Sequence, residues 1–168
     1  MPKIIENLES KLLEEAKRQI QEFGYGAMTI RSVAKGCGVG VGTVYNYFPS
    51  KEALLATYML SDWNRCIDAI NAVSTYSETV LPVLRCTYDQ LIGFAKLHHN
   101  VFTDEAAATA FAGSFGSYHK LLRDQLAQPL RKFCGDDFMP DFIAEALLTW
   151  SMAGKSFDEI WGIISKLF

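Results

Sequence analysis

The sequence predicts an all-α protein. Hydrophobic residues make up 49% of the 168 residues and charged residues 21%, proportions typical of a globular chain and not of a disordered one. Helix-forming residues dominate, and apolar residues recur at helical spacing, whereas the strict alternation of a strand is scarce. Only five prolines interrupt the chain. Each helix can therefore be placed from its apolar stripe and from the residues that signal its ends.

The first helix is expected over residues 4–23, where apolar residues recur every three or four positions. Charged residues fill most positions between them, so one face of this helix would pack inward. Gly24 follows at the position where a glycine commonly ends a helix. The apolar stripe consists of Ile5, Leu8, Leu12, Leu13, Ala16, Ile20 and Phe23.

Two short helical patterns follow, over residues 29–37 and 41–48, and the tetrapeptide CGVG joins them. So tight a turn between packed helices requires the backbone angles that glycine permits. Thr29 is placed to cap the first of these helices. Ser32 stands where an acidic residue would complete a capping box, so we expect a weakened helix end there. The pair of helices forms a helix-turn-helix.

The charge of the chain is unevenly distributed. From Gly24 to Lys51 there are three basic residues and no Asp or Glu, although the whole chain has a formal charge of -3. Residues 1–51 carry seven basic and five acidic residues, whereas residues 52–168 carry nine and fourteen. An acid-free surface on an otherwise acidic protein is typical of a site that meets the phosphates of DNA.

The helix-turn-helix region closely resembles the DNA-binding domain of TetR/AcrR-family transcriptional regulators. From Thr29 to Leu55 the matching positions read TIRxVAxxxGVxxGTVYxYFxSKEALL, at fixed spacing and without a gap. The resemblance covers roughly the first third of the chain. The rest resembles that family only in being helical and apolar.

This resemblance implies that residues 1–49 form a DNA-binding domain, with the helix-turn-helix at about 29–48. Residues 50–168 would then form a helical effector-binding and dimerisation domain, which completes a TetR-like fold. The helix over residues 41–48 would be the recognition helix that enters the major groove. The candidate DNA-binding residues are Thr29, Arg31, Gly40, Val41, Gly42, Thr43, Tyr45, Asn46, Tyr47 and Lys51.

Some of these roles have alternatives. Asn46 is included on chemical grounds, because its amide can bond an adenine edge, but a solvated surface amide explains it equally well. Tyr45 and Tyr47 match positions that contact phosphate, and a partly structural role stays open for both. The Gly40–Gly42 stretch offers few hydrogen-bonding groups, so site selection is expected to lean on DNA shape and on Arg31.

Four further helices are expected, over residues 51–73, 78–99, 104–112 and 117–133. Ser50 is placed to cap the first of them, and Pro82 falls in the first turn of the second, where proline is tolerated. Gly113 and Gly116 are expected to frame a loop or a kink.

The last segment, residues 140–168, repeats its apolar residues every seven positions without a change of phase. This pattern favours one long helix that packs on its own core and on a second copy of the chain. The alternative is a break at Gly154, because Ser156 and Glu159 have the spacing of a capping box. The candidate dimer-interface residues are Ile143, Leu147, Trp150, Gly154, Phe157, Trp161 and Ile164.

Aromatic residues are dense between the two ends of the chain, and several carry a polar tip that can orient a mostly apolar molecule. For any one of them an ordinary core position is the simpler interpretation. The resemblance implies an effector pocket in this region, so we take them together as candidates. The candidate ligand-binding residues are Tyr58, Trp63, Tyr88, Phe94, His98, Phe102, Phe111, Phe115 and Tyr118.

The sequence offers little for metal or cofactor chemistry. His98, His99 and His119 lack carboxylates or thiols at metal-binding spacing, so no metal site and no cofactor is expected. The four cysteines are far apart and contain no C-x-x-C pair, which favours reduced, buried thiols. The sequence contains no nucleophile elbow, phosphate loop or metal signature, so an enzyme is not expected.

Together with these features, the resemblance to TetR/AcrR-family regulators implies a ligand-responsive DNA-binding transcriptional regulator of the repressor type. It would bind a palindromic operator of double-stranded DNA as a homodimer and be released by a small, mostly apolar effector. The N-terminus lacks a signal-peptide core and no stretch is apolar enough to span a membrane, so a cytoplasmic protein is expected. The alternative is a helical interaction module of the same fold that does not bind DNA.

Overall fold

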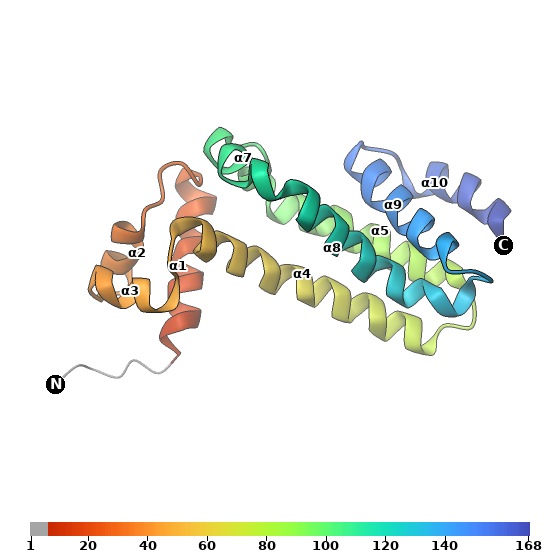
Figure 1. The fold of residues 1–168 in the computed structure, drawn as a ribbon, viewed down its shortest axis with the longest axis horizontal. Helices are drawn as coiled ribbons and strands as arrows, with labels where there is room; N and C mark the ends of the chain where they lie inside the picture. Colours follow the sequence, from red (N-terminus) through yellow and green to blue (C-terminus); the bar gives the residue numbers. More distant parts are fainter. Residues whose placement is uncertain (1–6) are drawn as a thin grey trace. The chain divides into compact units, whose positions relative to one another are not determined.

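The computed structural model describes residues 7–168, apart from the side chains of residues 114–117 (Figure 1). Throughout this part of the chain the regular secondary structure is helical, which confirms the predicted all-α class. The α-helices are α1 (Leu8–Phe23), α2 (Ile30–Gly36), α3 (Val41–Tyr47), α4 (Lys51–Tyr76), α5 (Val80–Leu97), α6 (His99–Phe102), α7 (Glu105–Phe111), α8 (Phe115–Ala127), α9 (Phe138–Met152) and α10 (Phe157–Ile164). Short 3₁₀ helices are η1 (Ala112–Ser114), η2 (Gln128–Phe133) and η3 (Ser165–Leu167).

The chain packs into two compact units. The first unit contains the described residues up to Ser61 together with His98–Ala112, and the second contains Asp62–Leu97 and Gly113–Phe168. Helix α4 therefore begins in the first unit and continues into the second. Packing decides this division, and the functional boundary at residues 49 and 50 stays a prediction.

The core of the first unit is built by one face of each of its helices. Leu12 and Ile20 of α1, Val33 of α2, Val44 of α3 and Leu54 of α4 are all essentially inaccessible to solvent. Burying a side chain of this size contributes about 1.5–3 kcal/mol relative to leaving it exposed. Short helices of seven residues, such as α2 and α3, depend on this packing because they are unstable alone.

The ends of α1 follow the sequence signals in part. Gly24 ends the helix at a φ of 83°, and its N–H donates to the Ile20 carbonyl, which confirms the predicted glycine stop. The helix begins at Leu8, after Asn7 in a left-handed conformation with φ 58°. The predicted start at residues 4–6 lies outside the described residues.

The core of the second unit is centred on α9, which packs against α8 and α5. Ile143 and Leu147 of α9 are fully buried together with Leu126 of α8 and Val83 of α5. Ser74 on α4 is buried too, and its hydroxyl donates to the Pro129 carbonyl at 2.8 Å. This buried contact explains why α4 continues beyond the expected end at Val73.

The preference for one long C-terminal helix is wrong. Helix α9 ends at Met152, Gly154 takes a φ of 83°, and α10 begins at Phe157. Ser156 and Glu159 form the reciprocal capping box that the sequence offered as the alternative. The seven-residue phase continues across the break because residues on both sides of it enter one core.

Three other boundaries differ from those expected. The helix predicted over residues 117–133 is α8 followed by η2, because Pro129 has no N–H to continue an α-helix. Gly116 lies within α8 and not in a loop. The sequence predicts one helix over residues 78–99, whereas α5 ends at Leu97 and the short α6 follows as a separate helix. No described helix is long and apolar enough to cross a membrane.

We predict that Gly36→Ala destabilises the first unit. A Cβ at Gly36 would enter the space held by the Glu15 side chain, which would have to leave its hydrogen bonds. The expected loss in free energy of unfolding is about 1–2 kcal/mol. Urea denaturation followed by circular dichroism would measure it.

The matched control is Gly42→Ala, which also lies in a short helix but has nothing within 4 Å of the added Cβ. Because alanine favours helix more than glycine does, we expect a gain of about 0.5–1 kcal/mol there. Equal effects of the two substitutions would contradict the proposed Glu15 contact.

Candidate nucleic-acid interface

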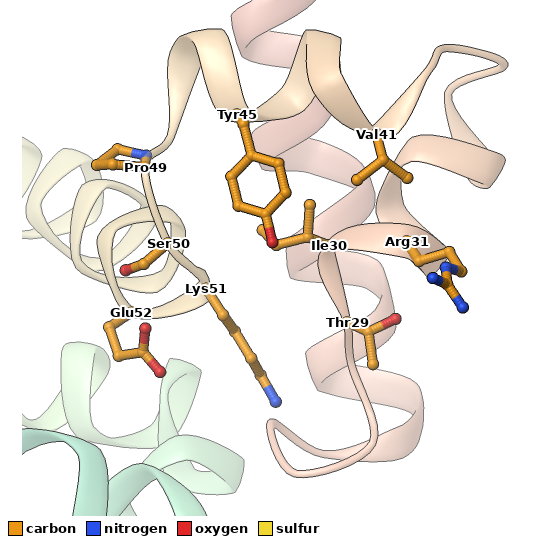
Figure 2. A pocket seen from close by; sticks show the side chains of 9 residues that line it. All are labelled: Thr29, Ile30, Arg31, Val41, Tyr45, Pro49, Ser50, Lys51 and Glu52. Carbon is orange, nitrogen blue, oxygen red and sulfur yellow. The ribbon is translucent and has the colours of Figure 1, made fainter.

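A concavity of about 540 Å³ lies on the first unit, where the start of α2, the face of α3 and the start of α4 meet (Figure 2). We call this concavity the cleft. Several predicted DNA-binding residues line it, and they come from three separate stretches of chain. The lining residues are Thr29, Ile30, Arg31, Val41, Tyr45, Pro49, Ser50, Lys51 and Glu52.

The start of α2 is fixed by a complete capping box. Thr29 Oγ1 accepts a hydrogen bond from the Ser32 N–H at 3.0 Å, and Ser32 Oγ accepts one from the Thr29 N–H at 3.0 Å. The expectation that Ser32 would weaken this helix end is wrong, because its hydroxyl takes the place of the usual carboxylate. The backbone that carries Thr29 and Arg31 is therefore held in one orientation.

Helix α1 supports this cap through a polar relay. The Ser32 hydroxyl donates to Gln19 Oε1 at 2.5 Å, and the Gln19 amide donates to Glu15 Oε1 at 2.7 Å. Arg18 then donates to both oxygens of Glu15, at 2.8 and 2.9 Å. These hydrogen bonds, chiefly that from Arg18, lower the pKa of Glu15 to about 2. Gln19 is only 6% exposed, so the relay is partly shielded from water.

Helix α3 has a buried side and an open side. Val44 anchors it in the core, whereas Gly42 and Asn46 are exposed and Tyr45 and Tyr47 are 51% and 45% exposed. Tyr45 lines the cleft. Both tyrosines can therefore present a hydroxyl group to a ligand.

The remaining residues of the α3 turn offer little polar chemistry. Gly40 caps the helix by position alone, without a side-chain hydrogen bond. Thr43 and Val41 are half-buried, and Val41 lines the cleft. The structure thus brings hydroxyl, amide and methyl groups together at one short helix.

Two basic residues border the cleft, and they differ in exposure and in contacts. Arg31 is exposed and points away from Lys51 in Figure 2. Lys51 runs toward the α1–α2 loop, with its Nζ 4.1 Å from the centre of the Tyr25 ring and 3.4 Å from the Gly26 carbonyl oxygen. Partial burial lowers the pKa of Lys51, although the negative charges of Asp104 and Glu52 act to raise it.

Sequence reasoning missed Glu52, which lies directly after the acid-free stretch and lines the cleft. Hydrogen bonds from its own N–H and from the Ser50 hydroxyl lower its pKa, so Glu52 is negatively charged at neutral pH. The Tyr25 hydroxyl donates to it at 3.3 Å. A phosphate would be repelled near Glu52 and favoured near Thr29 and Arg31.

The predicted ligand-binding residues divide between the two units. Tyr58, His98, Phe102 and Phe111 belong to the first unit, whereas Trp63, Tyr88, Phe94 and Tyr118 belong to the second. The side chain of Phe115 lies outside the described residues. The effector pocket stays a prediction.

Some of these residues pair within each unit. In the first, the rings of Tyr58 and His98 are 4.9 Å apart. In the second, the Trp63 ring meets Phe94 edge-on at 5.4 Å, and its indole N–H donates to Gln125 at 2.7 Å. Tyr88 donates to the Lys155 carbonyl at 3.0 Å.

The predicted dimer-interface residues have two fates. Four of them are buried in the core of the second unit, and a residue buried there leaves no surface for a partner. Trp150 is 51% exposed, Trp161 is half-buried and Gly154 lies at the exposed turn. The buried four are Ile143, Leu147, Phe157 and Ile164.

The same helices expose other apolar residues that the sequence pattern did not single out. They are Phe138, Phe142, Met152 and Ile163.

The described residues hold no group of three or more His, Cys, Asp or Glu side chains that suits a metal ion. His119 instead contacts the Glu145 carboxylate at 2.9 and 3.0 Å. The four cysteines are free thiols.

Residues 12–58 match the family model described as bacterial regulatory proteins of the tetR family. Over this segment the chain is similar to regulators of the TetR family. This match includes α2, α3 and every residue that lines the cleft, and the family is one of transcriptional regulators and not of enzymes.

Curated relatives match part of the chain. The HTH-type transcriptional regulator UidR of Escherichia coli K12 is 31% identical over 58 residues, which are 34% of this chain and 30% of that protein. The HTH-type transcriptional regulator YuxN of Bacillus subtilis is 30% identical over 71 residues, which are 42% of this chain and 24% of YuxN. The chain thus aligns with less than a third of the length of these relatives.

Solved structures match nearly the whole chain. A transcriptional regulator from Cytophaga hutchinsonii superimposes with a TM-score of 0.64 at 16% identity, covering 93% of this chain and 92% of that one. The fatty acid degradation regulator FadR of Bacillus halodurans gives a TM-score of 0.53 at 20% identity, covering 94% of both chains. At these identities the likeness establishes the fold.

We predict that Glu15→Gln removes part of the pH dependence of stability. A carboxyl whose pKa is lowered from 4.5 to about 2 stabilises the folded state above pH 4.5, and this contribution is lost as the pH falls toward 2. The variant should lose about 1–2 kcal/mol of the free energy of unfolding at pH 7, because solvent screens the partly exposed Arg18 partner.

Urea denaturation at pH 7 and at pH 3.5 would measure the difference between the variant and the parent. The deficit should shrink at the lower pH. Glu14→Gln, an exposed position on the same helix, is the control and should change stability little at either pH. A deficit that is the same at both pH values would show that the Glu15 charge is not involved.

Proposed function

We propose that this protein is a DNA-binding transcriptional regulator of the repressor type, which binds a palindromic operator as a homodimer. The observation that carries the DNA-binding part is the cleft itself. It brings together Thr29 and Arg31 at the start of α2 and Tyr45 on the exposed side of α3, within the segment that matches the TetR family.

The dimensions of α3 suit the major groove. A helix with its side chains is about 10–12 Å across, and the major groove of B-DNA is about 12 Å wide. With Val44 buried behind it, α3 would present Tyr45, Asn46 and Tyr47 outward. Val41 and Gly42, at the start of the helix, would leave room for a thymine methyl group.

Phosphate contacts would flank that helix. Thr29 and Arg31 lie at the fixed start of α2. Tyr45 and Tyr47 are about half exposed, so their hydroxyl groups would be able to donate to a phosphate oxygen. Such contacts set the register of the protein on DNA without reading its sequence. With few base-reading groups at Gly40–Gly42, DNA shape would contribute to site choice.

A dimer would place two such helices on successive major grooves, about 34–36 Å apart. Exposed apolar residues of α9 and α10, among them Trp150 and Ile163, would supply surface for a partner. A small, mostly apolar effector would then release DNA by binding one arrangement of the dimer more tightly than the other. A cytoplasmic location accompanies this role.

Two observations favour a second candidate, a helical interaction module that does not bind DNA. Glu52 places a negative charge in the cleft, and the Gly40–Gly42 stretch contributes no side-chain donor. Binding measurements on duplex DNA separate the two candidates.

We predict that Arg31→Ala weakens DNA binding by about tenfold or more and lowers the steepness of its salt dependence, because one phosphate contact accounts for a slope of about 0.9. Gel shifts at several salt concentrations, with DNA that flanks the gene, would measure both. Lys35→Ala, an exposed basic residue of α2 outside the cleft lining, is the charge-matched control. Equal losses in the two variants would show that only net charge matters, and a parent protein that retards no DNA at low salt would favour the second candidate.

We predict that Trp150→Glu yields monomers in sedimentation equilibrium, since a charge would replace an exposed apolar side chain on α9. Tyr76→Glu makes the same kind of change at the end of α4, where the ring is 89% exposed, and should leave the dimer intact. An undiminished dimer in Trp150→Glu would place the interface elsewhere.

A further inference from the structure

The loop that leads into the cleft is held by a residue far away in the sequence. This loop, Gly24 to Met28, joins α1 to the cap residue Thr29. Asp104, between α6 and α7, accepts a hydrogen bond from the Gly26 N–H through Oδ2 at 2.9 Å. Both residues belong to the first unit.

Asp104 serves two segments at once. Its other oxygen, Oδ1, accepts hydrogen bonds from the N–H groups of Ala106 and Ala107, at 2.9 and 3.1 Å, and so caps α7. Each carboxylate oxygen thus has its own task, and an aspartate is needed for both. These bonds, led by the one from Gly26, lower the pKa of Asp104 and keep it ionised.

The loop is shaped to fit this carboxylate. Gly24 has a φ of 83°, a conformation that glycine adopts without strain, and a Cβ there would lie 3.2 Å from Asp104 Oδ2. A Cβ at Gly26 would be 3.7 Å from the same oxygen. The backbone therefore approaches Asp104 closely on both sides of Tyr25.

The loop in turn positions the basic side of the cleft. The Gly26 carbonyl oxygen lies 3.4 Å from Lys51 Nζ, and the Tyr25 ring lies beneath the same ammonium group at 4.1 Å. The Tyr25 hydroxyl contacts Glu52 at 3.3 Å. The residue that fixes Gly26 thus also fixes the surroundings of Lys51 and Glu52, which both line the cleft.

We propose that Asp104 is a positioning residue for the DNA-contacting site. It holds the loop from Gly24 to Met28 in place, so that Lys51 and Thr29 keep their positions in the lining of the cleft. This inference rests on the proposed function, since the arrangement matters only if the cleft meets DNA. It assigns to a residue outside the helix-turn-helix a part in DNA affinity.

The substitution Asp104→Ser separates the two tasks of the carboxylate. Serine is a good N-cap and keeps the cap of α7, but its single short hydroxyl cannot also reach Gly26. The control is Asn100→Ala, which removes another tie between the same segment and α1, the 3.0 Å hydrogen bond from the Asn100 amide to the Gln21 carbonyl. That tie lies away from the cleft lining.

The affinity test uses a DNA duplex that the parent protein selects from a random-sequence pool. Asp104→Ser should weaken binding about five- to tenfold, as expected for a lost hydrogen bond to a charged group, and Asn100→Ala less than about twofold. In the parent background Lys51→Ala should also weaken binding. If Asp104 acts through Lys51, adding Asp104→Ser to Lys51→Ala should cost little more, a coupling that a general loss of stability would not produce.

A second measurement is independent of DNA. In Asp104→Ser, amide exchange of the Gly26 N–H should accelerate, while that of the Ala107 N–H should change little because the cap persists. Parent-like DNA affinity together with accelerated Gly26 exchange would overturn the positioning role. Unchanged Gly26 exchange would overturn the tie itself. A parent protein that selects no duplex would instead overturn the proposed function, and the positioning role with it.

Discussion

The helix-turn-helix depends on its packing against α1 and α4. Helices α2 and α3 have seven residues each, too few to persist without tertiary contacts. Val33 and Val44 are completely buried against side chains such as Leu12 and Leu54, and this burial holds both helices. Because the inner sides of α2 and α3 are fixed in this way, their outer sides present a constant surface, which a nucleic-acid site requires.

Polar contacts then set the orientation that apolar packing leaves free. From one side, the Gln19 relay reaches the α2 cap through the Ser32 hydroxyl. From another, the Asp104 carboxylate reaches the loop before it through Gly26. Directional bonds of this kind fix an angle, whereas hydrophobic contact mainly fixes proximity. The start of α2 is consequently held both at its capping box and through the loop that precedes it.

The charges around the cleft limit where a polyanion can sit. Arg31 is open to solvent, but Lys51 is engaged by Tyr25 and Gly26, and Glu52 remains ionised beside it. The ionised Glu52 carboxylate offsets part of the positive charge that Lys51 brings to the cleft. The favourable region for phosphate lies near the start of α2, where the Arg31 guanidinium is exposed and away from Glu52.

The all-α class and the helix-turn-helix could be predicted from the sequence, because helical periodicity and glycine stops are local signals. The sequence did not determine which distant polar groups meet. Ser32 finds Gln19 and Gly26 finds Asp104, 78 positions away, only after the core has formed. The capping box of Ser156 and Glu159 indicated the break at Gly154. The unbroken seven-residue pattern favoured a single helix instead, because residues on both sides of the turn enter one core. Tertiary structure decided these points because a polar group's partner depends on the folded path of the chain and not on spacing along it.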